Sequence, residues 1–209
     1  LKTIFEYPTL QQLAAEIDVI VLKPNEQGSI KLTPFDRQQM PIVMSYAQER
    51  LWFLDQLMPG SAIYNISNAI HINGILNVDQ LQHCFAQLIQ RHEILRYQFN
   101  EDNIVVSEHL DITIEQVDLT SLPEPDQSIV KNQLIQAESQ KPFNLNKDCL
   151  TRLTLIKLHD NEFVLLMTLH HIISDGWSIN VILQELSQFY ANNTPVVANL
   201  PIQYADYAH

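Results

Sequence analysis

An apolar run at residues 163–169 (FVLLMTL) leads directly into a polar loop, HHIISDGWS, at residues 170–178. A strand that is apolar at successive positions is usually covered on both faces, which places it in the middle of a sheet. Residues 150–158 form a second strand-like run, and the HDN at 159–161 is typical of a hairpin turn. The sequence therefore predicts a central hairpin whose second strand ends in two histidines.

Helix and strand signals alternate along the rest of the chain. A capping box at Ser45 and Gln48 starts a helix, Asn77 caps a helix whose apolar side runs to Leu95, and Asp126 can cap a third. This interleaving predicts an α/β (α+β) fold with a mixed β-sheet flanked by helices. The predicted helices occupy residues 45–58, 77–95, 126–140 and 179–190, and the remaining strands occupy residues 62–72, 97–99 and 104–118.

The front of the chain is organised differently. A capping box at Thr9 and Gln12 starts a short amphipathic helix, which we assign to residues 1–17. Prolines and a glycine interrupt residues 18–40, and we interpret this stretch as an interdomain linker. Residues 41–209 form the main domain. The chain starts with Leu1 rather than Met, so we expect it to be a piece of a longer protein.

Composition excludes several classes of function. The net charge is −12, from 12 Lys+Arg against 24 Asp+Glu, so a nucleic-acid partner is not expected. The two cysteines cannot form a disulfide framework or a four-cysteine zinc site, which fits a reducing cytoplasm. The apolar run at 163–169 is too short to span a bilayer, and we predict no signal peptide and no membrane partner.

The loop after the central strand holds the residues best suited to chemistry. Successive residues of an extended chain point to opposite sides, so one of His170 and His171 should face the core and the other an opening. Asp175 is close enough along the loop to fix His171. Gly176 allows a turn or a close approach to a ligand, and Ser178 can cap the helix that follows.

The residues alone leave three interpretations of this loop open. The two histidines can be hydrogen-bonded core residues, with Asp175 as a loop acid. A metal site is a second interpretation, but the loop offers no third histidine or cysteine at ligand spacing, and we predict no metal. In the third interpretation, one imidazole takes or holds a proton during acyl transfer, because imidazole titrates near neutral pH.

The loop also resembles a known motif. HHxxxDG at 170–176 is similar to the acyl-transfer motif of nonribosomal peptide synthetase condensation domains and of the related chloramphenicol acetyltransferase-like and CoA-dependent acyltransferases. Further motifs of condensation domains follow one another in order, and together they cover nearly everything after residue 40. They are SYAQERLWFL at 45–54 with PGSAIYNI at 59–66, RHEILRxxF at 91–99, KPFNL at 141–145 and YxDYA at 204–208.

The resemblance implies a chloramphenicol acetyltransferase-like fold and an activity, the joining of two carrier-bound thioesters by an amide bond. It makes His171 the catalytic residue, with His170 supporting the site. Asp175 would be a buried carboxylate paired with an arginine, for which we choose Arg96 over Arg91. Gly176 would place its amide near the reacting centre.

By the same resemblance, Trp177 and Ser178 would belong to the substrate tunnel, although for the Trp177 ring we favour a core position over the tunnel wall. Family members have two lobes, and residues 41–209 correspond to the N-terminal lobe alone. We therefore expect the C-terminal lobe to be absent from this chain, and the isolated lobe to have little or no condensation activity.

The first segment has its own resemblance. Residues 4–14 (IFEYPTLQQLA) look like the closing helix of a peptidyl carrier domain. This order implies upstream and downstream peptidyl carrier domains, an adjacent adenylation domain and the missing C-terminal lobe as partners. No cofactor is expected on this chain, because the phosphopantetheine would be carried by the partner carrier domains.

Two other functions compete with condensation. A stand-alone CoA-dependent acyltransferase would use the same histidine motif, but the carrier-like first segment argues against it. A non-catalytic carrier-docking module would keep the fold without the chemistry. Within the condensation family, DGWS after the histidines and WFLD in the opening helix favour the subtype that joins two L-residues.

Overall fold

The computed structural model describes residues 6–22, 32–37, 40–100, 103–108, 110, 112–192 and 199–208. The chain divides into two compact units, Leu1–Leu32 and Thr33–His209. In the first unit, helix α2 (Leu10–Leu22) begins at the predicted capping box, where the Gln12 amide donates to Thr9 Oγ1. The helix continues past residue 17 to Leu22, and the predicted linker residues 23–31 and 38–39 lie outside the described residues.

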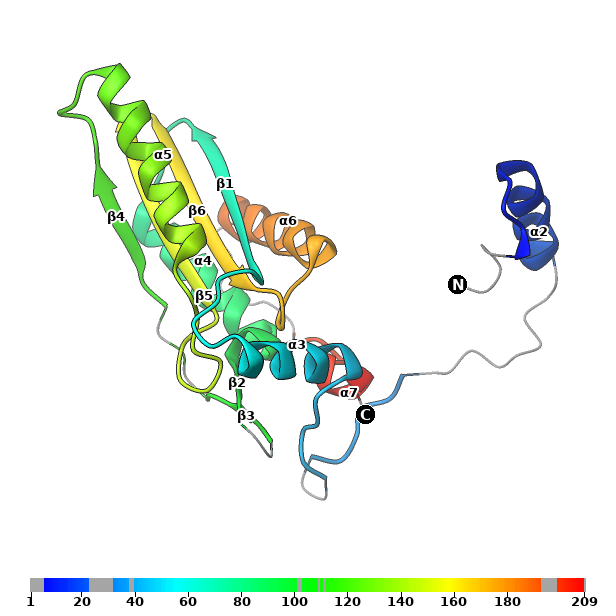
Figure 1. Cartoon of the computed structure of the whole chain (residues 1–209). Coiled ribbons are helices and arrows are strands. Elements are labelled where there is room, and N and C mark those ends of the chain that lie inside the picture. Colours follow the sequence, from blue (N-terminus) through cyan, green and yellow to red (C-terminus); the bar gives the residue numbers. More distant parts are fainter. Residues whose placement is uncertain are drawn as a thin grey trace. The chain divides into compact units, whose positions relative to one another are not determined.

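A four-stranded sheet forms the centre of the second unit, in the order β1-β6-β5-β4 (Figure 1). Strands β5 (Thr151–His159) and β6 (Glu162–His170) form the predicted hairpin. Strand β1 (Asn65–Asn73) pairs antiparallel with β6, and β4 (Ile114–Asp118) pairs parallel with β5. The sheet is therefore mixed, and its most apolar strand lies inside it, as the sequence predicted.

Helices cover both faces of this sheet (Figure 1). Helix α5 (Glu124–Gln140) packs on one face, where Ile156 and Leu166 meet its apolar side. Helices α4 (Val78–Arg91) and α6 (Gly176–Asn192) belong to the larger core on the other face. Since neighbouring residues of a strand point to opposite faces, both sets of residues of β5 and β6 must be apolar. This requirement explains the continuous run.

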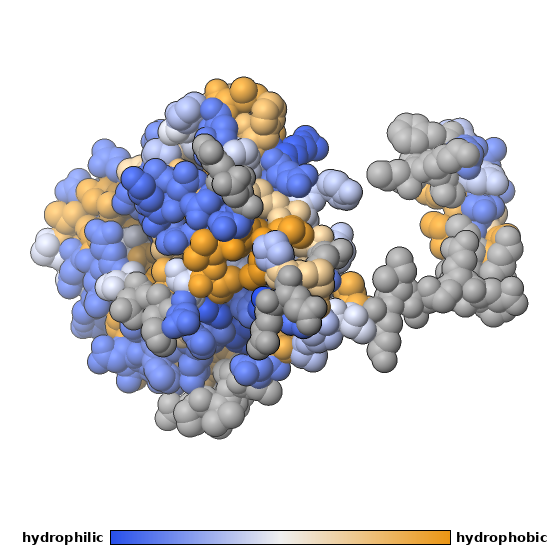
Figure 2. Space-filling view, turned by 90° about the horizontal axis from the view of Figure 1, so that it is seen from below, coloured by the Kyte–Doolittle hydropathy of each residue, from blue (hydrophilic) through white to orange (hydrophobic). Residues whose placement is uncertain are grey.

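The remaining elements gather at the end of the sheet where β6 ends (Figure 1). They are helix α3 (Tyr46–Leu57), the 3-10 helix η1 (Glu93–Arg96), helix α7 (Tyr204–Ala208), and a two-stranded sheet of β2 (Tyr97–Phe99) and β3 (Ile104–Val106). Figure 2, which views the second unit from this end, shows hydrophobic residues near the middle of the face and hydrophilic residues around them.

Several predicted boundaries were wrong, among them the start of α6, which is Gly176 rather than residue 179. Helix α5 begins at Glu124 with Pro123 as its N-cap residue, not at an Asp126 cap. Pro125 lies in its first turn, where the missing N–H of a proline is not needed. The helix predicted over 77–95 ends at Arg91, since His92 has an extended conformation and η1 follows. The single strand predicted over 104–118 is two short strands in different sheets.

Candidate active site in the loop after β6

The two histidines at the end of β6 face opposite environments, as predicted. The His170 side chain is only 1% exposed, and its Nδ1 accepts the Ile172 amide at 3.1 Å. The rings of Tyr64 and Phe143 meet the His170 ring edge-on, each with centroids 6.2 Å away. His171 is exposed, and its backbone amide donates to the Tyr64 carbonyl at 2.8 Å. The sheet therefore fixes the backbone of His171 and leaves its ring accessible.

Burial determines the charge of His170. Burial, together with a smaller effect of the nearby His171, lowers the pKa of the His170 ring to about 4. His170 is therefore neutral at neutral pH. Its role in the fold is to hold the start of the loop, where Ser174 Oγ also donates to the His170 carbonyl at 3.2 Å.

The surroundings of the His171 ring define its tautomer. His171 Nδ1 lies 2.6 Å from the Ser174 carbonyl oxygen. A carbonyl oxygen can only accept, so Nδ1 carries the hydrogen and donates it. In the neutral ring the lone pair is therefore on Nε2. This atom can accept a hydrogen bond or a proton from a group that approaches the loop.

Asp175 does not form the buried ion pair that the resemblance implied. Its side chain is exposed, and Oδ1 accepts both the Ser178 amide at 2.8 Å and the Ser178 hydroxyl at 2.6 Å. In return, the Asp175 amide donates to Ser178 Oγ at 3.2 Å. Asp175 therefore caps α6, a role predicted for Ser178, and these hydrogen bonds from Ser178 lower the pKa of the Asp175 carboxyl.

The expected partner of Asp175 is held elsewhere. The Arg96 guanidinium is buried and donates to the carbonyls of Ile89 at 3.2 Å and Ser107 at 2.6 Å. Arg91, the other candidate, pairs through Nε with Glu185 at 3.1 Å. The predicted Arg96–Asp175 pair was wrong because Arg96, at the end of η1, donates to a carbonyl of α4 and to the carbonyl of Ser107, directly after β3. Its guanidinium is therefore used within this part of the fold and not by the loop.

Gly176 and Trp177 are the first two residues of α6. The backbone of Gly176 and the exposure of Trp177 both differ from what the sequence led us to expect. Gly176 does not have a positive φ, and a Cβ built on it would meet nothing within 4 Å, so the turn itself does not require glycine. The side chain of Trp177 is 79% exposed, so the favoured core placement was wrong. As the second residue of α6, Trp177 lies beside the loop and lines the cleft described next.

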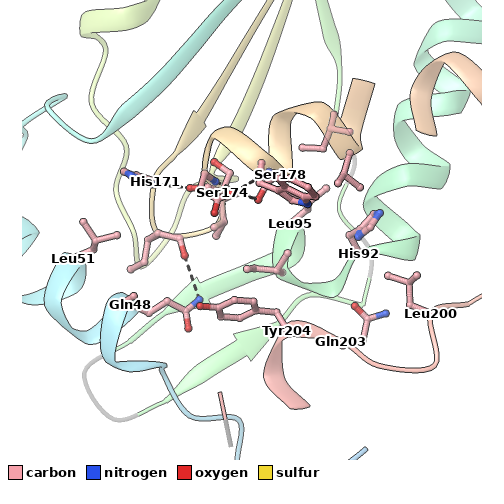
Figure 3. A pocket seen from close by; sticks show the side chains of 18 of the residues that line it. Gln48, Leu51, His92, Leu95, His171, Ser174, Ser178, Leu200, Gln203 and Tyr204 are labelled. Carbon is pink, nitrogen blue, oxygen red and sulfur yellow. Dashed lines mark hydrogen bonds between the residues drawn. The ribbon is translucent and has the colours of Figure 1, made fainter. Parts of the chain in front are cut away.

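A cleft of about 480 Å³ opens beside the loop (Figure 3). Its walls come from α3, the region of η1, the first turns of α6 and residues 200–204. Of the predicted site residues, His171, Asp175, Trp177 and Ser178 line this cleft. His170 and Arg96 lie outside it, buried in the fold behind.

Two cleft residues were missed or undervalued by sequence reasoning. Gln48 was interpreted only as part of a cap, but its buried Nε2 also donates to the Ile172 carbonyl at 3.2 Å (Figure 3). Tyr204, noted only as the start of a motif, places its hydroxyl 2.9 Å from Ser45 Oγ. Together they attach α3 to the loop and to α7. The capping box identified Gln48, but nothing in its spacing shows the second contact.

Metal clusters and membrane spans are both missing from the described residues. Among these residues, no group of three or more His, Cys, Asp or Glu is placed to hold a metal ion. No helix in the described parts of the chain is long and apolar enough to cross a membrane.

An exposed imidazole at the end of a rigid sheet, lining a cleft, is suited to accept a proton or a hydrogen bond during group transfer. Residues 38–209 match the family model named Condensation domain. The chain is also 38% identical over its full length to one of the linear gramicidin synthase proteins of Brevibacillus parabrevis. The chain therefore belongs to the condensation-domain family of nonribosomal peptide synthetases.

Solved structures share the same fold. The X-domain in its complex with OxyB from teicoplanin biosynthesis matches with a TM-score of 0.75 and 27% identity, over 87% of this chain and 40% of that one. A mutant of the starter condensation domain of rhizomide synthetase RzmA matches with a TM-score of 0.70 and 25% identity, over 77% of this chain and 41% of that one. The chain spans only 3% of the length of the gramicidin synthase protein.

Proposed function

We propose that this chain is the N-terminal lobe of a domain that forms amide bonds between two carrier-bound thioesters. The observation that carries the proposal is the His171 ring, whose Nδ1 is held by the Ser174 carbonyl while Nε2 is available beside the cleft. An acceptor nitrogen of this kind is what an attacking amine needs.

In the proposed reaction, the amine of a downstream aminoacyl thioester attacks the carbonyl carbon of an upstream acyl or peptidyl thioester. A C–N bond forms, the C–S bond breaks, and the thiolate leaves. His171 Nε2 accepts a hydrogen bond from the amine, and the proton lost by the amine ends on the leaving sulfur. Holding two reactive groups together supplies a large part of such an acceleration, so His171 also acts by orientation.

The partners follow from this reaction. We propose that phosphopantetheine arms on upstream and downstream peptidyl carrier domains bring the substrates. An adjacent adenylation domain would load them in the cytoplasm, and the second lobe of the domain would complete the tunnel. The helix of the first unit is proposed to be the end of the upstream carrier domain. The gramicidin synthase similarity supports a multidomain setting of this kind.

The test is dipeptide formation by the intact synthetase module with both carriers loaded. We expect His171→Ala to lower the rate by about 10²–10⁴-fold, the usual contribution of a positioned acid–base group. His83→Ala is the matched control, because His83 is an exposed histidine of α4 outside the cleft. Unchanged product formation by folded His171→Ala would refute the catalytic assignment.

A second candidate is a non-catalytic docking module. One structural neighbour is an X-domain in complex with OxyB, so this fold occurs in a protein-binding role. This function predicts that His171→Ala leaves dipeptide formation unchanged, whereas substitutions on the surface weaken the binding of a partner protein. The same pair of variants therefore separates the two functions.

A further inference from the structure

Apart from His171, whose Nε2 is available, most polar side chains that line the cleft are already hydrogen-bonded within the protein. Gln203 uses both ends of its amide, since Nε2 donates to the Arg91 carbonyl at 2.9 Å and Oε1 accepts the Glu93 amide at 3.1 Å. His92 Nε2 lies 2.6 Å from a Glu185 oxygen. A ligand in the cleft would therefore compete with existing bonds for most of these polar groups. Gln48, Ser174, Ser178 and Tyr204 are bonded in the same way.

Besides His171 Nε2, the cleft offers a ligand mainly apolar surface. Val181 comes from α6, and Leu200 and Ile202 come from the segment before α7. These three side chains are half-buried, and they line the cleft together with Leu51 and Leu95. Figure 3 shows His171 and Leu51 toward one side of the cleft and Leu200 toward the other. Contact with such walls favours apolar groups over charged ones, because a charge would lose hydration without gaining a partner.

The wall formed by residues 200–204 is fixed in place. The side-chain amide of Gln203 bridges this segment to the backbone between α4 and η1. The Gln203 backbone amide donates to Asp206 at 2.7 Å, and the Tyr204 hydroxyl meets Ser45. A wall anchored at both its backbone and its side chains can discriminate by shape. This anchoring distinguishes the wall from a loose surface segment.

We infer that the cleft beside His171 holds an apolar side chain of the aminoacyl or acyl group that reacts there, and that Val181 and Ile202 help to select it. This inference rests on the proposed function, since it takes the group at His171 to be a substrate. His171 and the apolar side chains line the same cleft, so a group bound beside His171 can contact these walls.

The test measures binding of two stable probes to the chain, the amide analogues of leucyl-pantetheine and aspartyl-pantetheine, by calorimetry or NMR titration. We expect the leucyl probe to bind about tenfold or more tightly than the aspartyl probe, as burial of a Leu side chain predicts. Val181→Lys and Ile202→Lys should each remove this preference, because an ammonium group on the wall attracts the aspartyl carboxylate and makes the wall polar. Ile75→Lys should keep the preference, because Ile75 is 98% exposed and lies outside the cleft.

The same variants are then compared in the intact module, with carriers loaded with leucine or aspartate. Val181→Lys should shift the ratio of the two products toward aspartate, because the new ammonium group attracts the aspartate carboxylate. Equal binding of the two probes, or a product ratio that does not change, would overturn the inference and indicate that protein rather than substrate covers the cleft. The proposed function is tested separately, by the effect of His171→Ala on dipeptide formation. The inference can therefore fail while the proposed function holds, and the two failures are distinguishable.

Discussion

The sheet and the cleft use polar groups in opposite ways. In the sheet, His170 is buried and neutral at neutral pH, and its ring nitrogen serves a backbone amide. In the cleft, His171 is exposed, and one ring nitrogen is held so that the other is available. One peptide bond separates the two environments. Neighbouring residues of the same type can therefore take a structural role and a proposed chemical role, because strand alternation sends their side chains to opposite sides.

The largest expected effect lies in the sheet. Leu169 is fully buried in the central strand, next to His170. Leu169→Ala should lower the free energy of unfolding by about 2–5 kcal/mol through lost burial and the cavity left behind. Denaturant titration measures this change. The matched substitution Ile75→Ala, at a residue that is 98% exposed, should change it by less than about 0.5 kcal/mol. Similar losses for the two variants would mean that β6 is not central to the core.

The pH dependence of stability sharpens the contrast between the histidines. Above pH 6.5 the His170 ring is neutral in both the folded and the unfolded chain, so it contributes no dependence. Between pH 6.5 and about 4, the unfolded chain binds a proton that the folded ring does not bind. As the pH is lowered from 6.5 to about 4, the free energy of unfolding should therefore decrease, and His170 alone should account for about 3 kcal/mol of this decrease.

His170→Asn is the control for that measurement, because the Asn side-chain oxygen can replace Nδ1 as an acceptor but does not titrate. Unfolding titrations of the two proteins between pH 4 and 7 give the difference that belongs to His170, since the other acidic and basic groups are common to both. Parallel pH profiles would show that His170 is protonated as easily in the folded chain as in the unfolded one.

Gln48 connects the two regions, and its removal should have an intermediate effect. Gln48→Ala leaves the Ile172 carbonyl without its side-chain donor inside the protein. We expect a loss of about 1–3 kcal/mol in the free energy of unfolding, the cost of an unpaired buried polar group. Glu49→Ala, at the exposed neighbour in the same helix, is the matched control. Equal melting temperatures for the two variants would contradict the proposed link between α3 and the loop.

The sequence predicted the parts of this molecule that depend on local pattern. The apolar run at 163–169 required a strand covered on both faces, and strand alternation separated His170 from His171. The Ser45 and Asn77 caps started their helices where expected. These features depend on residues close together in the chain, so their physical causes can be read without a structure.

The predictions that were wrong or incomplete concern contacts between segments that are distant in the sequence. The choice of Arg96 as the partner of Asp175 required knowing that η1 turns its guanidinium toward the Ile89 carbonyl. The second contact of Gln48 crosses 124 positions of sequence. The cleft itself needs α3, α6 and residues 200–204 in one place. No periodicity encodes such meetings, and the resemblance supplied the histidine's role but not this geometry.

The smallest effect tests the corrected role of Asp175. Asp175→Ala removes the cap of α6 and should lower the free energy of unfolding by about 1 kcal/mol, measured by denaturant titration. The double variant with Arg96→Met should show almost no coupling energy, because each side chain has its own partners in the described structure. A coupling energy of about 1 kcal/mol or more would instead show that Arg96 and Asp175 interact. The loop would then be held by η1 as well as by its own cap, and the cleft would depend on the buried core more than the contrast between His170 and His171 indicates.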